Sequence, residues 1–176
     1  MPTVAIIGAG PLGRWLALEA ARAGFSVLLE DVMPSNLHHA QELIRQQLNP
    51  ESLPAVRFVS SIEDAVREAD LVIDCVPDEL ESKLEILWLL DRMSPPQTVF
   101  ATPTTRLSIA DLAACTYRPE KCVAIAAEAS ALTANSSSEI LLRTTARTAP
   151  ETTALLDDFW RRLGRSPIFE QELSPA

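Results

Sequence analysis

Residues 3–13 read TVAIIGAGPLG, and this stretch decides the fold of the 176-residue chain. The run 3–8 is short, apolar and rich in β-branched residues, which is typical of a strand buried on both faces of a parallel sheet. Gly8, Gly10 and Gly13 then follow in the spacing Gly-x-Gly-x-x-Gly, and residues 14–23 show helical periodicity before Gly24. The stretch therefore predicts a strand, a tight turn and a helix, the opening of a dinucleotide-binding fold.

Each glycine of this turn has a mechanical reason. Gly8 permits the tight turn, Gly10 lets the backbone approach a pyrophosphate, and Gly13 lets the helix pack on the strand. A second strand, residues 25–30, ends before Asp31, about twenty residues further along the chain. A carboxylate there accepts hydrogen bonds from ribose hydroxyls and repels a 2′-phosphate, so the sequence favours NAD(H) over NADP(H). The alternatives are a glycine-rich turn without a ligand and a solvated acid, Glu30 being predicted to point to the opposite face.

Strands alternate with helices along the rest of the chain. Further strands are predicted at 56–59, 70–76, 98–101, 121–126, 139–146 and 167–171, and further helices at 34–48, from 61, and at 79–93, 108–116 and 148–163. Ser61 and Ser108 are predicted helix caps, as is Thr148, while residues 128–138 are predicted as a loop. This order predicts a doubly wound α/β fold with a mostly parallel sheet of Rossmann type. The length makes residues 1–176 one domain, with its ligand crevice at the carboxyl ends of the strands.

Composition excludes several classes of protein. Acidic residues number 24 against 15 basic ones, a formal net charge of −9, which argues against nucleic acid or a membrane surface as partner. The two histidines, His38 and His39, are adjacent, and no metal site is expected. Cys75, Cys115 and Cys122 have no metal spacing and are interpreted as reduced thiols. With no targeting signal or membrane span visible, the sequence predicts a cytoplasmic protein.

Three other stretches resemble the NAD-binding domain of the 3-hydroxyacyl-CoA dehydrogenases. They are residues 69–78 (ADLVIDCVPD) followed by Lys83, residues 95–109 (PPQTVFATPTTRLSI) and residues 117–123 (YRPEKCV). The resemblance covers residues 2–170, with a shortened stretch near 49–57. It implies an NAD-binding oxidoreductase domain of fatty acid metabolism, which passes a hydride between C3 of a 3-hydroxyacyl-CoA and nicotinamide. In that family a helical domain follows, which closes over the acyl chain and makes the dimer.

The resemblance also implies where the reacting groups lie. The family's glutamate falls on Asp78, its serine on Thr105 and its general-base histidine on Ala126. The alanine side chain cannot accept or donate a proton, so the isolated chain is expected to have negligible activity on 3-hydroxyacyl-CoA. Glu128 is predicted two residues beyond Ala126 on the same strand, and it or Asp78 is a candidate replacement base. The candidate catalytic residues are thus Asp78, Thr105 and Glu128, with a solvated acid and a helix N-terminal acid as the plainer interpretations of the two carboxylates.

The candidate cofactor contacts combine the glycine turn with positions given by the resemblance. They are Gly8, Gly10, Pro11, Leu12, Gly13, Asp31, Val76, Pro77, Lys83 and Thr104. Lys83 has the alternative of a surface residue on its helix. Trp15, Trp88 and Trp160 are predicted at core positions, and Tyr117 is predicted to pack. The helix 79–93 is predicted to turn an apolar face with residues 84, 87, 88 and 93 inward.

Three functions fit this sequence. The first is an oxidoreductase of the family that uses another base, the second is a non-catalytic module that senses NAD, and the third is the cofactor-binding subunit of a two-chain dehydrogenase. Predicted partners are NAD(H), an acyl-CoA or other small substrate, and either a second copy in a homodimer or a separate helical chain. The basic groups that the second helix offers to CoA phosphates are His38, His39 and Arg45, more simply interpreted as a solvated face.

Overall fold

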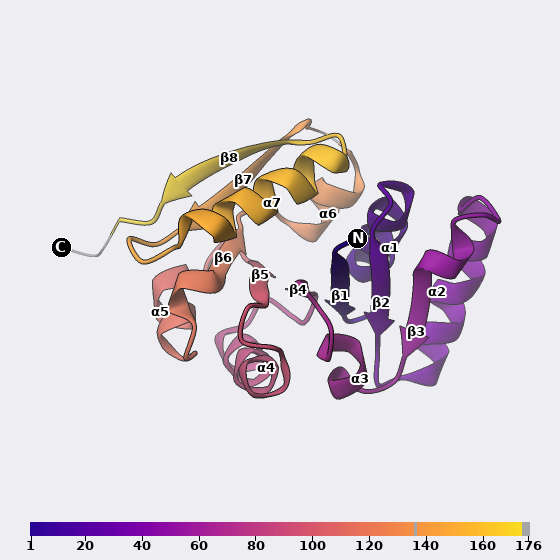
Figure 1. Cartoon of the computed structure of the whole chain (residues 1–176), viewed down its shortest axis with the longest axis horizontal. Coiled ribbons are helices and arrows are strands. Elements are labelled where there is room, and N and C mark those ends of the chain that lie inside the picture. Colours follow the sequence, from indigo (N-terminus) through magenta and orange to yellow (C-terminus); the bar gives the residue numbers. More distant parts are fainter. Residues whose placement is uncertain (136, 174–176) are drawn as a thin grey trace.

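Eight strands form one sheet in the computed structural model, which describes residues 1–135 and 137–173 (Figure 1). The strands are β1 (Thr3–Ile7), β2 (Ser26–Glu30), β3 (Val56–Val59), β4 (Leu71–Asp74), β5 (Val99–Pro103), β6 (Cys122–Ile125), β7 (Glu139–Thr144) and β8 (Ser166–Gln171). Their order across the sheet is β3-β2-β1-β4-β5-β6-β7-β8. Neighbouring strands are parallel except for the antiparallel pair β6 and β7. The predicted mostly parallel Rossmann-type sheet is confirmed.

Helices cover both faces of the sheet. They are α1 (Pro11–Arg22), α2 (Pro34–Gln47), α3 (Ile62–Val66), α4 (Leu80–Met93), α5 (Ile109–Ala114), α6 (Ala129–Thr133) and α7 (Pro150–Arg162). Helices α1, α2, α6 and α7 contribute to one hydrophobic core, and α3, α4 and α5 contribute to the other. Figure 1 shows these two groups on opposite sides of the strands. This is the doubly wound arrangement that alternating strands and helices predict.

The central strand β1 explains why the first stretch of sequence is apolar throughout. Val4 and Ile6 point into the core beneath α1, whereas Ala5 and Ile7 point into the core on the other face. Ile6 pairs in register with Leu29 of β2 and with Ile73 of β4, so β1 lies between two parallel neighbours. A strand buried on both faces needs apolar residues at every position, because its side chains alternate between the faces.

Two of the three predicted helix caps are confirmed. Ser61 and Ser108 accept hydrogen bonds of 3.2 Å from the backbone N–H groups of Asp64 and Asp111. Thr148 is not the cap of α7, because Ala149 occupies that position. The Thr148 hydroxyl instead accepts the N–H of Thr145 at 2.8 Å and closes the turn between β7 and α7.

The structure corrects several burial predictions on helices. Trp160 is fully buried as predicted and Trp15 is partly buried, but Trp88 is 52% exposed and Met93 is 40% exposed. The buried face of α4 carries Lys83, Ile86, Leu87 and Leu90. Tyr117 is 98% exposed, so the prediction that it packs is wrong.

Helix α6 lies within residues 128–138, which were predicted as a loop. Its small and polar sequence has no helical periodicity to reveal it, and tertiary packing decides the conformation. Leu132 is its one buried residue, and the helix contacts α1. Within the described residues, no helix is long and apolar enough to cross a bilayer, and no acid, cysteine or histidine cluster is suited to a metal.

Candidate cofactor and reaction site

A crevice of about 310 Å³ opens at the carboxyl ends of β1, β4, β5 and β6. Six candidate cofactor residues line it, namely Gly10, Pro11, Leu12, Gly13, Val76 and Pro77. Asp78 and Glu128, two of the candidate catalytic residues, line it as well. From β1 the chain runs to β2 and β3 on one side, and it then returns from β3 to β4 on the other side of β1. This switch point is where open α/β sheets bind ligands.

The three glycines of the turn meet different surroundings. Gly8 adopts a φ of +104°, which favours glycine, and its N–H donates to the carbonyl of Glu30 at 2.8 Å. A Cβ on Gly13 would lie 1.7 Å from the Gly8 carbonyl oxygen, so only glycine allows α1 to approach β1 this closely. A Cβ on Gly10 would meet no protein atom within 4 Å, although Gly10 lines the crevice. The turn therefore leaves space where a pyrophosphate would approach the backbone.

Helix α1 begins at this turn with an arrangement suited to an anion. Gly10 is the N-cap residue and Pro11 is the first helical residue, which has no N–H group. The α1 N-terminus carries no acidic side chain in its first turn. Free N–H groups and the positive end of the helix dipole therefore face the crevice, as binding of a dinucleotide pyrophosphate requires.

Asp31, which follows β2 and is not among the residues that line the crevice, holds the glycine turn in place. Its carboxylate accepts hydrogen bonds from the N–H of Ala9 at 2.9 Å, the N–H of Met33 at 2.8 Å and the side-chain amide of Asn36 at 3.2 Å. An ionised carboxylate offers about four acceptor positions, so three donors leave capacity for one ribose hydroxyl. Sequence reasoning predicted the ribose role and missed the bonds to the protein backbone.

Lys83 does not lie on the surface of α4. Its side chain is fully buried, and Nζ donates to Asp74 Oδ1 at 2.6 Å. The prediction of a surface residue is wrong because α4 turns this position toward the sheet, where β4 ends in a buried carboxylate. Lys83 is not among the residues that line the crevice.

The candidate catalytic residues form one hydrogen-bonded cluster from three loops. Asp78 follows β4 and accepts the Thr104 hydroxyl at 2.5 Å and the Thr105 N–H at 3.2 Å. The Thr105 hydroxyl, beyond β5, donates to Glu128 Oε1 at 3.0 Å. Thr104, a candidate cofactor contact, is therefore used here to hold Asp78. The structure brings Asp78, Thr105 and Glu128 together at one edge of the sheet.

Ala126 and Glu128 do not share the face of a strand. Strand β6 ends at Ile125, and the N–H of Ala127 donates back to the Ile125 carbonyl at 2.9 Å. The chain turns there, so the alternation of side chains that underlies the prediction is lost. Glu128 is instead the exposed N-cap residue of α6.

The crevice also contains residues that the sequence analysis did not assign to cofactor binding or catalysis. They are Cys75, Pro103, Ala127 and Ala129. Cys75, Pro103 and Ala127 lie within two residues of the carboxyl end of a strand, and this position is the signal that would have identified them, whereas Ala129 begins α6. Burial raises the pKa of the Cys75 thiol, with a smaller contribution from Asp74, so this sulfur stays protonated and unreactive.

Glu30 is a buried acid directly beneath the glycine turn. Glu30 is 3% exposed, and Oε1 has no hydrogen-bond partner among the residues that the structure describes. Burial, followed by the nearby charge of Asp31, raises the pKa of Glu30 from 4.5 to about 7. The folded protein therefore binds the Glu30 proton more tightly than the unfolded chain does.

We predict that Glu30→Gln removes part of the pH dependence of stability. Because the pKa of Glu30 is raised on folding, the contribution of Glu30 to wild-type stability falls as pH rises from about 4.5 to about 7, then levels off. The variant lacks this fall and gains up to about 3 kcal/mol relative to wild type between pH 5 and pH 8. Urea unfolding of both proteins at the two pH values measures the difference, with Glu151→Gln as the exposed control. Parallel pH profiles for wild type and Glu30→Gln would contradict the assignment.

Comparisons with known proteins agree with this geometry. The chain matches the family described as 3-hydroxyacyl-CoA dehydrogenase, NAD binding domain, over residues 3–173. A probable 3-hydroxybutyryl-CoA dehydrogenase of Bacillus subtilis is 29% identical over 68% of this chain and 46% of its own length. The 5-formyl-3-hydroxy-2-methylpyridine 4-carboxylate 5-dehydrogenase of Mesorhizobium japonicum is 29% identical over 98% of this chain and 58% of its own length.

A solved structure extends the comparison to three dimensions. The 3-hydroxybutyryl-CoA dehydrogenase of Escherichia coli K12 superimposes with a TM-score of 0.84 at 28% identity, over 97% of this chain and 38% of that one. The chain thus spans about half the length of the curated relatives above and less of this structure.

Proposed function

The chain belongs to the family of 3-hydroxyacyl-CoA dehydrogenase NAD-binding domains, and from this premise we propose that it is a single domain, residues 1–176, that binds NAD(H) in the crevice without oxidising 3-hydroxyacyl-CoA on its own. NAD is the cofactor of this family and of this chain. The observation that carries the proposed site is Gly10, where the crevice keeps open the space that a side chain would fill.

We assign the cofactor contacts as follows. The backbone N–H groups after Gly10, at the N-terminus of α1, hold the pyrophosphate, and the Asp31 carboxylate accepts a hydrogen bond from a ribose hydroxyl. Val76 and Pro77 line the crevice beyond β4. Gly8 and Gly13 shape the turn. Lys83 does not contact the cofactor directly; its buried ion pair with Asp74 supports the end of β4.

Asp31 supports a preference for NAD(H) over NADP(H), because a 2′-phosphate would bring negative charge against its carboxylate. We predict that wild type binds NADPH at least about tenfold more weakly than NADH, a difference of about 1.4 kcal/mol. Asp31→Ser should narrow this ratio and also weaken NADH binding, because it removes the bond to the Ala9 N–H. Isothermal titration calorimetry with NADH and with NADPH measures both dissociation constants, and Asp64→Ser is a control remote from the turn. Equal or tighter binding of NADPH by wild type would overturn the assignment.

The side chains at the candidate catalytic positions support weak or absent activity on the family's substrate. Hydride removal from a secondary alcohol requires a base for the hydroxyl proton, and the position of the family's histidine holds Ala126. Glu128 and Asp78 are the carboxylates that line the crevice there, and Thr105 bonds to both. We propose that any proton transfer in this chain uses Glu128, with Thr105 holding its carboxylate and Asp78 holding the loop of Thr105.

Two alternatives remain within the proposal. A non-catalytic NAD-sensing module is favoured by Ala126. A cofactor-binding subunit of a two-chain dehydrogenase would receive its acyl-CoA or other small substrate against a separate helical chain. A thermal shift with NADH but no turnover supports the first, and co-purification of a helical protein supports the second.

We also propose that the protein is cytoplasmic and self-associates as a homodimer when no helical partner is present. Three free thiols, those of Cys75, Cys115 and Cys122, are typical of a reducing compartment. Burial raises the pKa of Cys122 to about 12, so this thiol is not a reactive one.

A further inference from the structure

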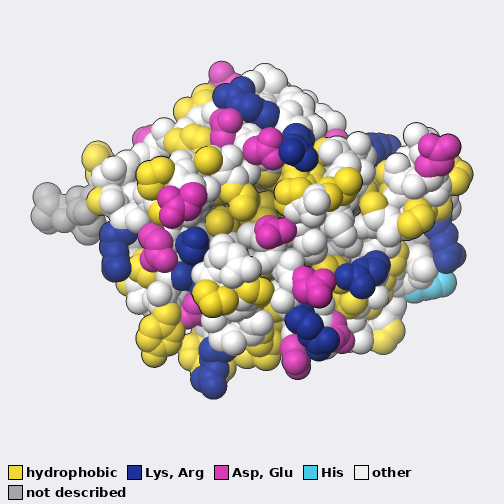
Figure 2. Space-filling view, viewed as in Figure 1, with side chains coloured by type: hydrophobic (Ala, Val, Ile, Leu, Met, Phe, Trp, Pro, Cys, Tyr) yellow, Lys and Arg dark blue, Asp and Glu magenta, His cyan; other side chains and the backbone are white. Residues whose placement is uncertain are grey.

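Helix α4 presents an apolar side chain to solvent in the middle of its outer face. Trp88 is 52% exposed, and the guanidinium of Arg92 lies 4.5 Å from the centre of its ring. Leu80 at the start of the helix is 51% exposed, and Met93 at its end is 40% exposed. Figure 2 shows hydrophobic side chains over α4 at the bottom of the view, with dark blue cations among them. Large aromatic and arginine side chains are the groups that anchor protein interfaces.

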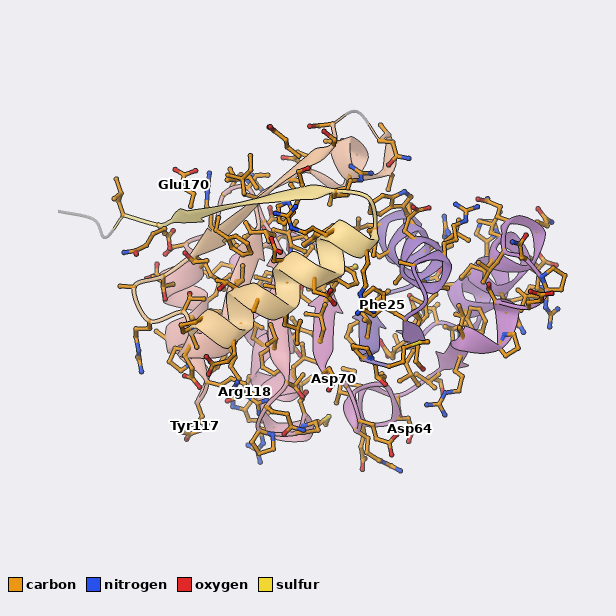
Figure 3. All side chains as sticks on the ribbon, turned by 45° about the horizontal axis from the view of Figure 1, so that its top comes forward. Phe25, Asp64, Asp70, Tyr117, Arg118 and Glu170 are labelled. Carbon is orange, nitrogen blue, oxygen red and sulfur yellow. The ribbon has the colours of Figure 1, made fainter. Side chains whose placement is uncertain are left out.

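A loop next to α4 extends this surface. Tyr117 is 98% exposed, and its N–H donates to Asp91 Oδ2 on α4 at 2.8 Å. Figure 3 shows Tyr117 pointing away from the body of the protein, beside Arg118. Arg118 is buried, and its Nε forms an ion pair with Oδ1 of the same Asp91 carboxylate at 2.8 Å. The loop that presents Tyr117 is therefore fixed on α4. A fully exposed tyrosine on a fixed loop contributes contact area at a low entropic cost.

The charges on the outer face of α4 are separated along the helix. Residues 81, 85, 88 and 92 lie on one side of the helix, because they are three or four positions apart. Glu81 and Glu85 precede Trp88, whereas Arg92 follows it. Within residues 1–135 and 137–173, neither Glu81 nor Glu85 forms an ion pair or a side-chain hydrogen bond.

This pattern is complementary to itself. When two copies of α4 pack antiparallel about a two-fold axis near Trp88, Arg92 of each copy lies beside Glu85 of the other. A hollow of about 270 Å³ also opens along α4, and Glu85 belongs both to this hollow and to the side of the helix that carries Trp88. The hollow is lined by Val76, Pro77, Ser82, Glu85, Ile86 and Leu89. Opposite charges on either side of an exposed indole make this surface self-complementary, as a two-fold, isologous interface requires.

We propose that α4, with Tyr117 beside it, is the surface through which two copies of this chain form a dimer. The proposal names the interface for the self-association proposed above, and it does not depend on NAD binding. Trp88 of each copy packs against α4 of the other, and two symmetry-related pairs of Arg92 and Glu85 set the antiparallel direction. Ile168, an exposed apolar side chain on β8, lies outside this interface.

Sedimentation equilibrium without nucleotide, across micromolar concentrations, tests the proposal. Wild type should show a reversible monomer–dimer equilibrium, and Trp88→Ala should raise the dimer dissociation constant about 30-fold or more, the effect of a central interface anchor. Ile168→Ala, the matched control, should leave that constant unchanged. A monomeric wild type, or a dimer that Trp88→Ala leaves intact, would overturn the proposal. Circular dichroism checks that each variant is folded.

A charge exchange tests the direction of packing. Arg92→Glu and Glu85→Arg should each weaken the dimer by roughly 3- to 10-fold, because each places like charges opposite one another. The double variant should restore dimerisation to within about twofold of wild type, since each copy then carries both reversed charges. Two single variants that weaken the dimer and add in the double variant would overturn the antiparallel arrangement.

Discussion

Gly10→Val should abolish NADH binding while leaving the fold intact. A side chain at this position enters the crevice, where the pyrophosphate of a dinucleotide must approach the backbone. No protein atom lies within 4 Å of a Cβ placed there, so the side chain costs the protein itself little. Gly10 has φ −72° and ψ −171°, an extended conformation that valine adopts readily. We expect affinity to fall by at least about 100-fold, or about 2.7 kcal/mol.

Gly13→Ala provides the contrasting control for this prediction. Its Cβ would lie 1.7 Å from the Gly8 carbonyl oxygen, so α1 must shift away from β1 and unfolding should become easier. Thermal unfolding and calorimetry on both variants separate the two roles. Gly10→Val should unfold close to wild type and bind no NADH. Retained NADH affinity in Gly10→Val would mean that the glycine loop is only a turn.

Oxidation of 3-hydroxybutyryl-CoA by the isolated chain should be negligible. Loss of a general base alone costs on the order of 10²–10⁴ in rate, and Ala126 stands where the family places that base. Glu128, the candidate replacement, is exposed, and its carboxylate already accepts the Thr105 hydroxyl at 3.0 Å. Steady-state assays with NAD⁺ measure the residual rate.

Ala126→His should restore little of this activity. The N–H of Ala126 donates to the Leu141 carbonyl at 2.9 Å, so the backbone there is fixed. However, Thr105 also replaces the family's serine, and a histidine at position 126 does not restore it. Turnover of wild type near 1–10³ s⁻¹, the usual range for enzymes, would show that another residue acts as the base. Glu128→Gln would then be the decisive variant, with Glu151→Gln as its control.

Local patterns predicted most of the fold because they are set by neighbouring residues. The apolar run of β1 and the serine caps at Ser61 and Ser108 depend on residues only a few positions apart, and the structure has them as predicted. The crevice was also predictable, because carboxyl ends of parallel strands meet at one edge. Gly10, Val76 and Asp78 line it for that reason.

The wrong predictions depend on contacts between distant elements. A lysine on a helix is ordinarily exposed, and only the packing of α4 against β4 shows that Lys83 meets Asp74 in the core. A tryptophan on a helix is ordinarily buried, but the position of Trp88 on α4 faces away from the sheet. Strand alternation fails for Glu128 because the chain turns after Ile125, next to the bond from the Ala126 N–H to the Leu141 carbonyl of β7.

A calorimetric titration of NADH into the wild-type chain, followed by addition of acetoacetyl-CoA to the same sample, tests the central claim most directly. We predict saturable binding of one NADH per chain and no loss of NADH absorbance after acetoacetyl-CoA is added. Absence of binding heat, together with no thermal shift, would contradict the assignment of the crevice as an NAD site.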